Sequence, residues 1–224
     1  MVHGAWVAGW CWRPIARPLR AKGHEVYTPT LTGVGERSHL LRAGIDLDTH
    51  IKDILNVIKF EELSGIVLCG HSYGGMVVTG VADAVPDKIA ALVYLDAFVP
   101  ENGQALADLV PQGRQPMGDG IAVPPLPPSA FGVSPEKAAL WESRLTPHPA
   151  QCFTQPVKRT GGIGRIRRRH YIYANDPQPT SFTQFYEKFR NAPGWTVHTL
   201  PCTHLVQLDM PAELTQLLLD AASQ

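Results

Sequence analysis

The feature that most constrains the fold of this chain is a short apolar segment followed directly by a glycine-flanked serine. Residues 66–69 read IVLC, a continuous apolar run typical of a strand buried in a parallel sheet. Residues 70–74 read GHSYG, which matches the pattern G-x-S-x-G, and residues 76–85 have the pattern of a helix that ends before Pro86. Glycines on both sides of the turn let the strand and helix backbones approach closely. The segment therefore predicts a nucleophile elbow with Ser72 at its tip.

The segments around this turn alternate between helices and strands. Such alternation is typical of a doubly wound, mostly parallel sheet, so the predicted fold class is α/β. Gly23 is expected to end the first helix, and Asp48 with Thr49 to cap the second. Apolar spacing predicts helices over 13–22, 48–58, 76–85, 182–189 and 212–222, and strands over 24–28, 66–69, 89–95, 171–174 and 196–200.

Chain length and proline content predict the domain organisation. A chain of 224 residues has room for one domain with a sizeable core, because single α/β domains commonly contain about 200–250 residues. Eleven of the twenty prolines lie between residues 100 and 156, where neither helical nor strand periodicity persists. We therefore expect a single domain whose core comprises residues 1–99 and 166–224, with a proline-rich cap inserted at 100–165.

Charge and cysteine usage exclude several classes of partner. Twenty lysines and arginines balance twenty aspartates and glutamates, so no net field attracts nucleic acid or an anionic membrane. The four cysteines form no metal-ligand or disulfide pattern and no apolar run could span a membrane, which predicts a cytoplasmic protein. The pattern Asp46-x-Asp48-x-His50 could supply metal ligands, but helix capping explains Asp48 and no third ligand is apparent. Neither a metal nor a cofactor is expected.

A serine nucleophile requires a base, and in chains with this elbow the base follows the serine. Four of the nine histidines do so, at positions 148, 170, 198 and 204. The first lies in the predicted cap, and the next two fall on or beside predicted strands. His204 lies in the loop between the last predicted strand and the last predicted helix, where a base would stand over the elbow. His204 is therefore the predicted base.

The base needs an acid that fixes its orientation, and two aspartates qualify. Asp96 and Asp176 each lie at the carboxyl end of a predicted strand, the edge of an α/β sheet at which catalytic groups collect. Asp96 directly precedes the segment AFVP and could equally cap the start of the insertion. Asp176 is therefore the preferred acid, and Asp96 is the alternative.

An oxyanion intermediate needs two backbone N–H donors. The residue after the nucleophile, Tyr73, supplies one of them, and an early loop supplies the other. Residues 3–5 read HGA and can form that loop, so the Ala5 N–H is the predicted second donor. In hydrolases, each such donor contributes about 3 kcal/mol of transition-state stabilisation.

Several ordered motifs resemble one group of enzymes. They are HGAW at 3–6, GWCW at 9–12, GHEV at 23–26, GHSYGGM at 70–76, AFVP at 97–100 and TH at 203–204. Together they resemble the α/β-hydrolase group of plant methylesterases and hydroxynitrile lyases and its related bacterial carboxylesterases, which include pyrethroid-hydrolase-like enzymes. The resemblance covers nearly the whole chain outside the predicted cap. It implies a triad of Ser72, Asp176 and His204, in which the 28-residue step from the acid to the histidine agrees with the family.

The chain departs from this group at positions that bear on its activity. Lyases of the group carry a lysine directly after the catalytic histidine and a threonine where Gly4 stands, whereas this chain has Leu205 and Gly4. No cation is then available for the leaving group of a cyanohydrin, so the resemblance favours an esterase. Only Met1 and Val2 precede His3, whereas relatives enter this loop from a full strand. We expect a trimmed or misassigned start, and greater stability and activity in a version extended upstream.

These observations predict a serine carboxylesterase that hydrolyses a small apolar or aromatic ester through an acyl-enzyme intermediate. Its substrate pocket is expected to include Gly4, Trp6, Phe98 and Leu205. A hydroxynitrile lyase on the same scaffold and a ligand-binding receptor with a slow triad are the alternatives. The sequence leaves open whether the protein forms a homodimer.

Overall fold

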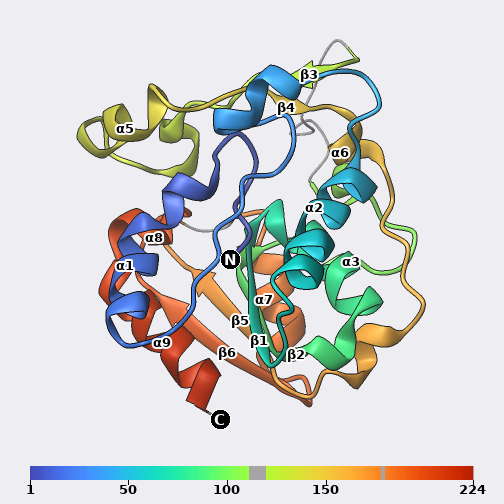
Figure 1. Ribbon diagram of the computed structural model, residues 1–224. Coiled ribbons are helices and arrows are strands. Elements are labelled where there is room, and N and C mark those ends of the chain that lie inside the picture. Colours follow the sequence, from blue (N-terminus) through green and yellow to red (C-terminus); the bar gives the residue numbers. More distant parts are fainter. Residues whose placement is uncertain (111–119, 178–179, 224) are drawn as a thin grey trace.

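A four-stranded parallel sheet lies at the centre of the fold (Figure 1). The computed structural model describes residues 1–110, 120–177 and 180–223. The strands, in their order across the sheet, are β1 (Ile66–Ser72), β2 (Ile89–Ala97), β5 (Arg169–Ala174) and β6 (Trp195–Leu200). Each neighbouring pair is parallel, so the carboxyl ends of all four strands meet at one edge.

Helices cover both faces of this sheet. They are α1 (Arg13–Ala21), α2 (Leu47–Phe60), α3 (Gly74–Ala84), α7 (Thr183–Phe189) and α9 (Pro211–Ser223). α1 and α9 pack together and share one apolar core with the sheet, in which Ile15 and Leu214 are fully buried. α2, α3 and α7 contribute to a second core on the other face, which buries Ile54, Met76 and Phe185. This two-layered covering confirms the predicted α/β class with a doubly wound, mostly parallel sheet.

Shorter elements connect these layers. They are α4 (Leu106–Leu109), β3 (Ala122–Val123), α5 (Pro135–Glu142), β4 (His148–Pro149), α6 (Gln151–Thr154) and α8 (Val206–Asp209), with 3-10 helices at Gly9–Trp12, Gly35–Leu40, Pro86–Lys88, Pro128–Phe131 and Gly162–Arg165. β3 pairs with β4 in a small antiparallel sheet at the top of Figure 1. Several of these elements fall in the predicted cap, of which residues 111–119 lie outside the described residues. A distinct cap at 100–165 stays a prediction.

Two local predictions are wrong. Residues 24–28 form no strand, because a strand needs a pairing partner and none runs alongside them in the described part of the chain. Their Tyr27 carbonyl instead accepts a hydrogen bond from the amino group of Met1 at 2.7 Å. The cap of α2 is Asp46 rather than Asp48: its extended backbone lets its carboxylate accept from the Thr49 N–H at 2.9 Å.

The other predicted strands and helices are confirmed, with small shifts at their ends. The strand predicted at 66–69, for example, continues to Ser72, and residues 69–71 pair with residues 93–95 of β2. β1 therefore carries the serine to the edge at which the strands end. Within the described ranges, no helix has both the length and the apolar character needed to cross a membrane.

Candidate active site

Ser72 lies in a strained turn between β1 and α3. Its φ angle is +54°, a backbone conformation that non-glycine residues rarely adopt and that a nucleophile elbow requires. The glycines around it permit a very close approach: a methyl group at Gly70 would lie 2.7 Å from the Gly74 carbonyl oxygen, and one at Gly74 would lie 2.7 Å from the Val2 carbonyl oxygen. The predicted close packing of strand and helix at the elbow is confirmed.

His204 lies in the loop that follows β6, where the sequence places it. Its Nδ1 donates a hydrogen bond to Asp96 Oδ2 at 2.6 Å, and both side chains are buried. Asp96 is the second-last residue of β2 and has a φ angle of +38°. Its other carboxyl oxygen accepts a hydrogen bond from the Ala174 N–H at 3.2 Å. The acid is thus held from two sides before any substrate arrives.

Burial sets the protonation state of this histidine. Loss of contact with water lowers the pKa of the His204 imidazole below its ordinary value, so the ring is neutral at pH 7. Burial acts in the opposite direction on Asp96 and raises the pKa of its carboxyl group, against the effect of the Ala174 N–H. With Nδ1 committed to Asp96, the Nε2 atom of His204 is left to take a proton.

Aromatic rings fix the orientation of the His204 imidazole. The Phe182 ring stacks on it with a centroid separation of 4.7 Å and an interplanar angle of 8°. The Phe131 ring also stacks on it, at 5.1 Å. The main chain is held as well, because His71 Nε2 donates to the His204 carbonyl oxygen at 2.9 Å. These contacts limit the imidazole to one plane.

Ser72 and His204 line the same cavity, which has a volume of about 350 Å³. No hydrogen bond joins the Ser72 hydroxyl to His204 within the described residues, and such bonds often tighten only when substrate is bound. The wall of this cavity is largely apolar and also includes the exposed Asp176. Its aromatic residues other than His204 are Trp6, Tyr73, Phe98, Phe131, Phe153 and Phe182.

The loop at residues 3–5 lies directly against the elbow. A methyl group at Gly4 would lie 3.0 Å from Ser72 Cβ, so a side chain there would meet the nucleophile. Buried His3 holds this loop: its Nδ1 donates to the Gly4 carbonyl oxygen at 2.8 Å, while its Nε2 accepts from the Leu31 N–H at 3.1 Å. Because a trans peptide is planar, fixing the Gly4 carbonyl also fixes the direction of the Ala5 N–H, which points the opposite way.

The next residue, Trp6, is anchored just as firmly. Its φ angle is +63°, and its N–H donates to His148 Nδ1 at 3.4 Å. Its carbonyl accepts from the Thr146 N–H at 3.0 Å, and its indole Nε1 donates to the Val123 carbonyl at 3.1 Å. In the described part of the chain, neither the Ala5 N–H nor the Tyr73 N–H donates to a turn, loop or side-chain acceptor, so both are available to a ligand.

The family follows from comparison with known proteins. A profile of the alpha/beta hydrolase family matches residues 1–217. The chain belongs to the α/β-hydrolase family. It is 42% identical to a carbendazim hydrolyzing esterase from Nocardioides sp. (strain SG-4G), over 96% of each chain. It is 31% identical to a pyrethroid hydrolase from Sphingobium wenxiniae, over 79% of this chain and 54% of that protein. These relatives confirm the predicted enzyme class, a carboxylic ester hydrolase.

Solved structures support the same fold. An extracellular α/β-hydrolase from a Paenibacillus species superposes with a TM-score of 0.81, at 24% identity over 98% of this chain and 96% of that one. A pyrethroid hydrolase from Sphingobium faniae JZ-2 superposes with a TM-score of 0.80, at 24% identity over 99% and 95% of the two chains. At this level of identity the likeness concerns the fold alone.

The structure of this α/β hydrolase corrects the expected partner of its histidine. Asp176, the preferred acid, is exposed, and the hydrogen bond of His204 goes to Asp96. The strand order explains this outcome: β2 lies between β1 and β5, so the end of β2 lies beside Ser72, whereas Asp176 follows β5, one strand further away. Asp176 instead donates its backbone N–H to the Cys202 carbonyl at 3.1 Å.

The four expected pocket residues all reach the neighbourhood of Ser72. Gly4, Trp6 and Leu205 line a small cavity of about 30 Å³ together with Ser72 and His204, and Phe98 lines the larger one. Sequence reasoning did not find the supporting partners of the early loop, His148 above all. No local pattern could have revealed His148, because it contacts Trp6 from 142 positions away in the chain.

Proposed function

We propose that this α/β hydrolase is a serine carboxylesterase with Ser72 as nucleophile, His204 as general base and Asp96 as the acid that orients the histidine. The observation that carries the proposal is the buried hydrogen bond from His204 to Asp96 beside a serine in a left-handed elbow. A neutral imidazole with one nitrogen held by an acid is the arrangement that activates a serine hydroxyl.

The reaction follows from this geometry in two halves. His204 Nε2 takes the hydroxyl proton as Ser72 Oγ attacks the ester carbonyl carbon, and the protonated imidazole then gives that proton to the departing alcohol. The acyl group stays on Ser72. A water molecule next transfers a proton to His204 and attacks the acyl carbon, which releases the carboxylic acid and regenerates the serine.

The two N–H groups of Ala5 and Tyr73 would hold the negative oxygen that forms in each half. Both lie at the elbow, both lack another acceptor within the described residues, and one is fixed through the bond from His3 to the Gly4 carbonyl. Donors arranged in advance stabilise the intermediate more than water does, because they need no reorganisation during the reaction.

The cavity favours an apolar or aromatic ester of modest size. Its volume is about 350 Å³ and its wall is mostly apolar with several aromatic rings, so a flat apolar group would displace water favourably there. No lysine or arginine occurs among the described residues that line either cavity beside Ser72, which disfavours a charged acid or a cyanohydrin. Aryl esters and carbendazim, after which the 42% identical relative is named, are suitable assay substrates.

Because all four cysteines are free, we assign the protein to a reducing compartment such as the cytoplasm.

The proposal is tested by replacing Ser72. Ser72→Ala should lower kcat/KM for a nitrophenyl ester by at least about 10⁴-fold and abolish covalent labelling by an organophosphonate that reacts with activated serines. Ser64→Ala is the matched control, because Ser64 is exposed and lies just before the first residue of β1, at the end of the strand far from Ser72. Full hydrolysis by Ser72→Ala, or labelling at another serine, would rule out the proposed nucleophile.

A further inference from the structure

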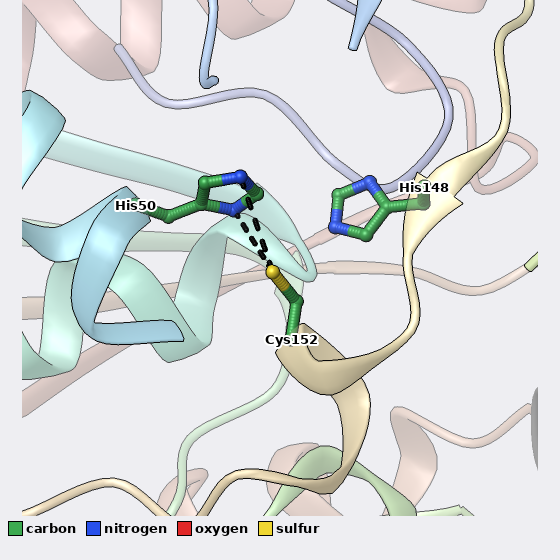
Figure 2. Close-up of side chains that lie close together, drawn as sticks. All are labelled: His50, His148 and Cys152. Carbon is green, nitrogen blue, oxygen red and sulfur yellow. Dashed lines mark hydrogen bonds between the residues drawn. The ribbon is translucent and has the colours of Figure 1, made fainter. Parts of the chain in front are cut away.

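Three potential metal ligands meet behind the early loop, outside the proposed triad. They are His50 from α2, His148 from β4 and Cys152 from α6, whose side chains Figure 2 draws. All three are buried, and one donor atom from each lies within 4.8 Å of the other two. The chain segments that carry them are far apart in the sequence, so only the fold brings them together.

His50 is already oriented as metal-binding histidines are. Its Nε2 must carry the proton, because it bonds to the Thr32 carbonyl at 2.8 Å and a carbonyl only accepts. Nδ1 therefore has the lone pair, which accepts a hydrogen bond from the Tyr73 hydroxyl at 2.8 Å and lies 3.5 Å from Cys152 Sγ. A metal ion bound at Nδ1 would replace the bond to the hydroxyl. Metal-ligating imidazoles usually donate their second N–H to such a carbonyl. Two donors on one tetrahedral zinc ion are separated by about 3.5 Å, as this nitrogen and sulfur are.

His148 supplies an independent sign of a missing partner. Its Nε2 is buried and has no hydrogen-bond partner, although unpaired buried polar atoms are costly and rare. Figure 2 shows the ring extending from β4 with this nitrogen turned toward the space between His50 and Cys152. With Nδ1 accepting from the Trp6 N–H, this Nε2 carries the proton, and it becomes free to bind a metal when the proton moves to Nδ1.

We propose that His50 Nδ1, His148 Nε2 and Cys152 Sγ bind a zinc ion, with the Tyr73 hydroxyl as the fourth donor. Imidazole nitrogen and thiolate sulfur are donors that zinc binds, and zinc accepts the tetrahedral arrangement that four donors allow. The donors that lie up to 4.8 Å apart must close to about 3.5 Å, a side-chain movement of roughly 1 Å. The Tyr73 and His148 rings, whose centroids are 4.6 Å apart, already enclose the site on one side.

Zinc binding changes where two protons lie. The Cys152 thiol gives its proton to solvent, because the thiolate is the form that binds a metal. In the empty site His148 Nδ1 accepts from the Trp6 N–H, so Nε2 of that ring carries the proton. When zinc binds, this Nε2 proton leaves and Nδ1 gains one.

Zinc binding would also weaken the proposed oxyanion site, and this consequence rests on the proposed function. Once His148 Nδ1 carries a proton, it can no longer accept from the Trp6 N–H, which now lies 3.4 Å away. Trp6 directly follows Ala5, and Tyr73 provides both the second oxyanion N–H and the fourth zinc donor. Zinc should therefore lower kcat by at least about tenfold, since the loss of one whole donor costs 10²–10³-fold.

The test measures metal binding directly on the full chain. Titration calorimetry should find one high-affinity zinc ion per chain, and Co²⁺ as a probe should give a thiolate-to-metal charge-transfer band. Cys152→Ser should lose that band and weaken zinc binding by about 100-fold. Cys202→Ser and His198→Asn are matched controls that should bind as the parent does, since they remove another buried cysteine and a half-buried histidine stacked on His170.

The remaining outcomes separate this proposal from the proposed function. Ser72→Ala should bind zinc with the parent affinity, so a failed esterase assignment would leave the metal site intact. Circular dichroism checks that each variant is folded. Weak, non-stoichiometric zinc binding by the parent, or unchanged binding by folded Cys152→Ser, would overturn the site.

Discussion

Two unlike sets of polar groups support the cavity beside Ser72. One is a buried layer, in which His204 lines the cavity and the others bond to His204 or to residues of the early loop, and the other is an exposed rim. The buried layer consists of His3, Asp96, His148 and His204, each fully or almost fully hidden from water. The rim carries Asp176, which lines the same cavity but is exposed.

The contrast teaches what makes a side chain suitable for catalysis here. Asp96 and Asp176 both follow strands of the same sheet, yet one accepts from His204 at 2.6 Å and the other points to solvent. A place at a strand end is therefore insufficient. In the proposed site, the acid also lies on the strand beside Ser72 and is shielded from water, which would otherwise screen the charge that it stabilises.

The largest effect should come from breaking the bond in the buried layer. Asp96→Asn keeps the shape of the side chain but can hold His204 in the wrong tautomer, so kcat/KM for an aryl ester should fall about 10⁴-fold. The measurement is steady-state hydrolysis, with thermal unfolding as the check that the variant is folded. A loss below tenfold would mean that Asp96 does not orient the base.

A smaller effect should follow from releasing the early loop. His3→Ala removes the donor to the Gly4 carbonyl, so the Ala5 N–H is no longer fixed and kcat should fall about 10- to 100-fold with little change in KM. His3→Asn places an amide N–H near the position of the lost Nδ1 and should recover part of kcat. Equal activity of the two variants would show that only packing matters at this position.

Two buried histidines, one in the buried layer and one on α2, should also make stability depend on pH. Burial lowers the pKa of His3 and of His50 to about 4, below the ordinary value of 6.5 that each has when unfolded. The unfolded chain then binds more protons between these values, so the free energy of unfolding should decrease as pH falls from about 6.5 to 4. Each histidine contributes a slope of about 1.4 kcal/mol per pH unit. Urea unfolding at several pH values checks this, and a flat profile would contradict it.

The smallest effect should come from the rim. Asp176→Asn removes a charge whose carboxylate has solvent access, so stability should change by less than about 0.5 kcal/mol and kcat/KM by less than about threefold. The measurement pairs this variant with Asp96→Asn on one ester. A loss from Asp176→Asn as large as that from Asp96→Asn would erase the distinction between layer and rim.

Local pattern was enough for most of the fold and for part of the site. The apolar run before the elbow, the glycines around Ser72 and the loop position of His204 are all short-range signals, and the structure keeps each of them. The strand expected at 24–28 was wrong because a strand exists only when another strand pairs with it. Local alternation cannot supply that partner.

The sequence by itself determined the nucleophile elbow, the order of helices and strands and the two candidate acids, because each depends on neighbours along the chain. Only the tertiary structure pairs His204 with Asp96 and not with Asp176, since that pairing depends on which strand lies beside β1. The same holds for His50, His148 and Cys152, which the fold gathers from three separate segments. Burial, which lowers the pKa of His50 and His148 and raises the pKa of Asp96 and Cys152, is likewise a property of the packed molecule.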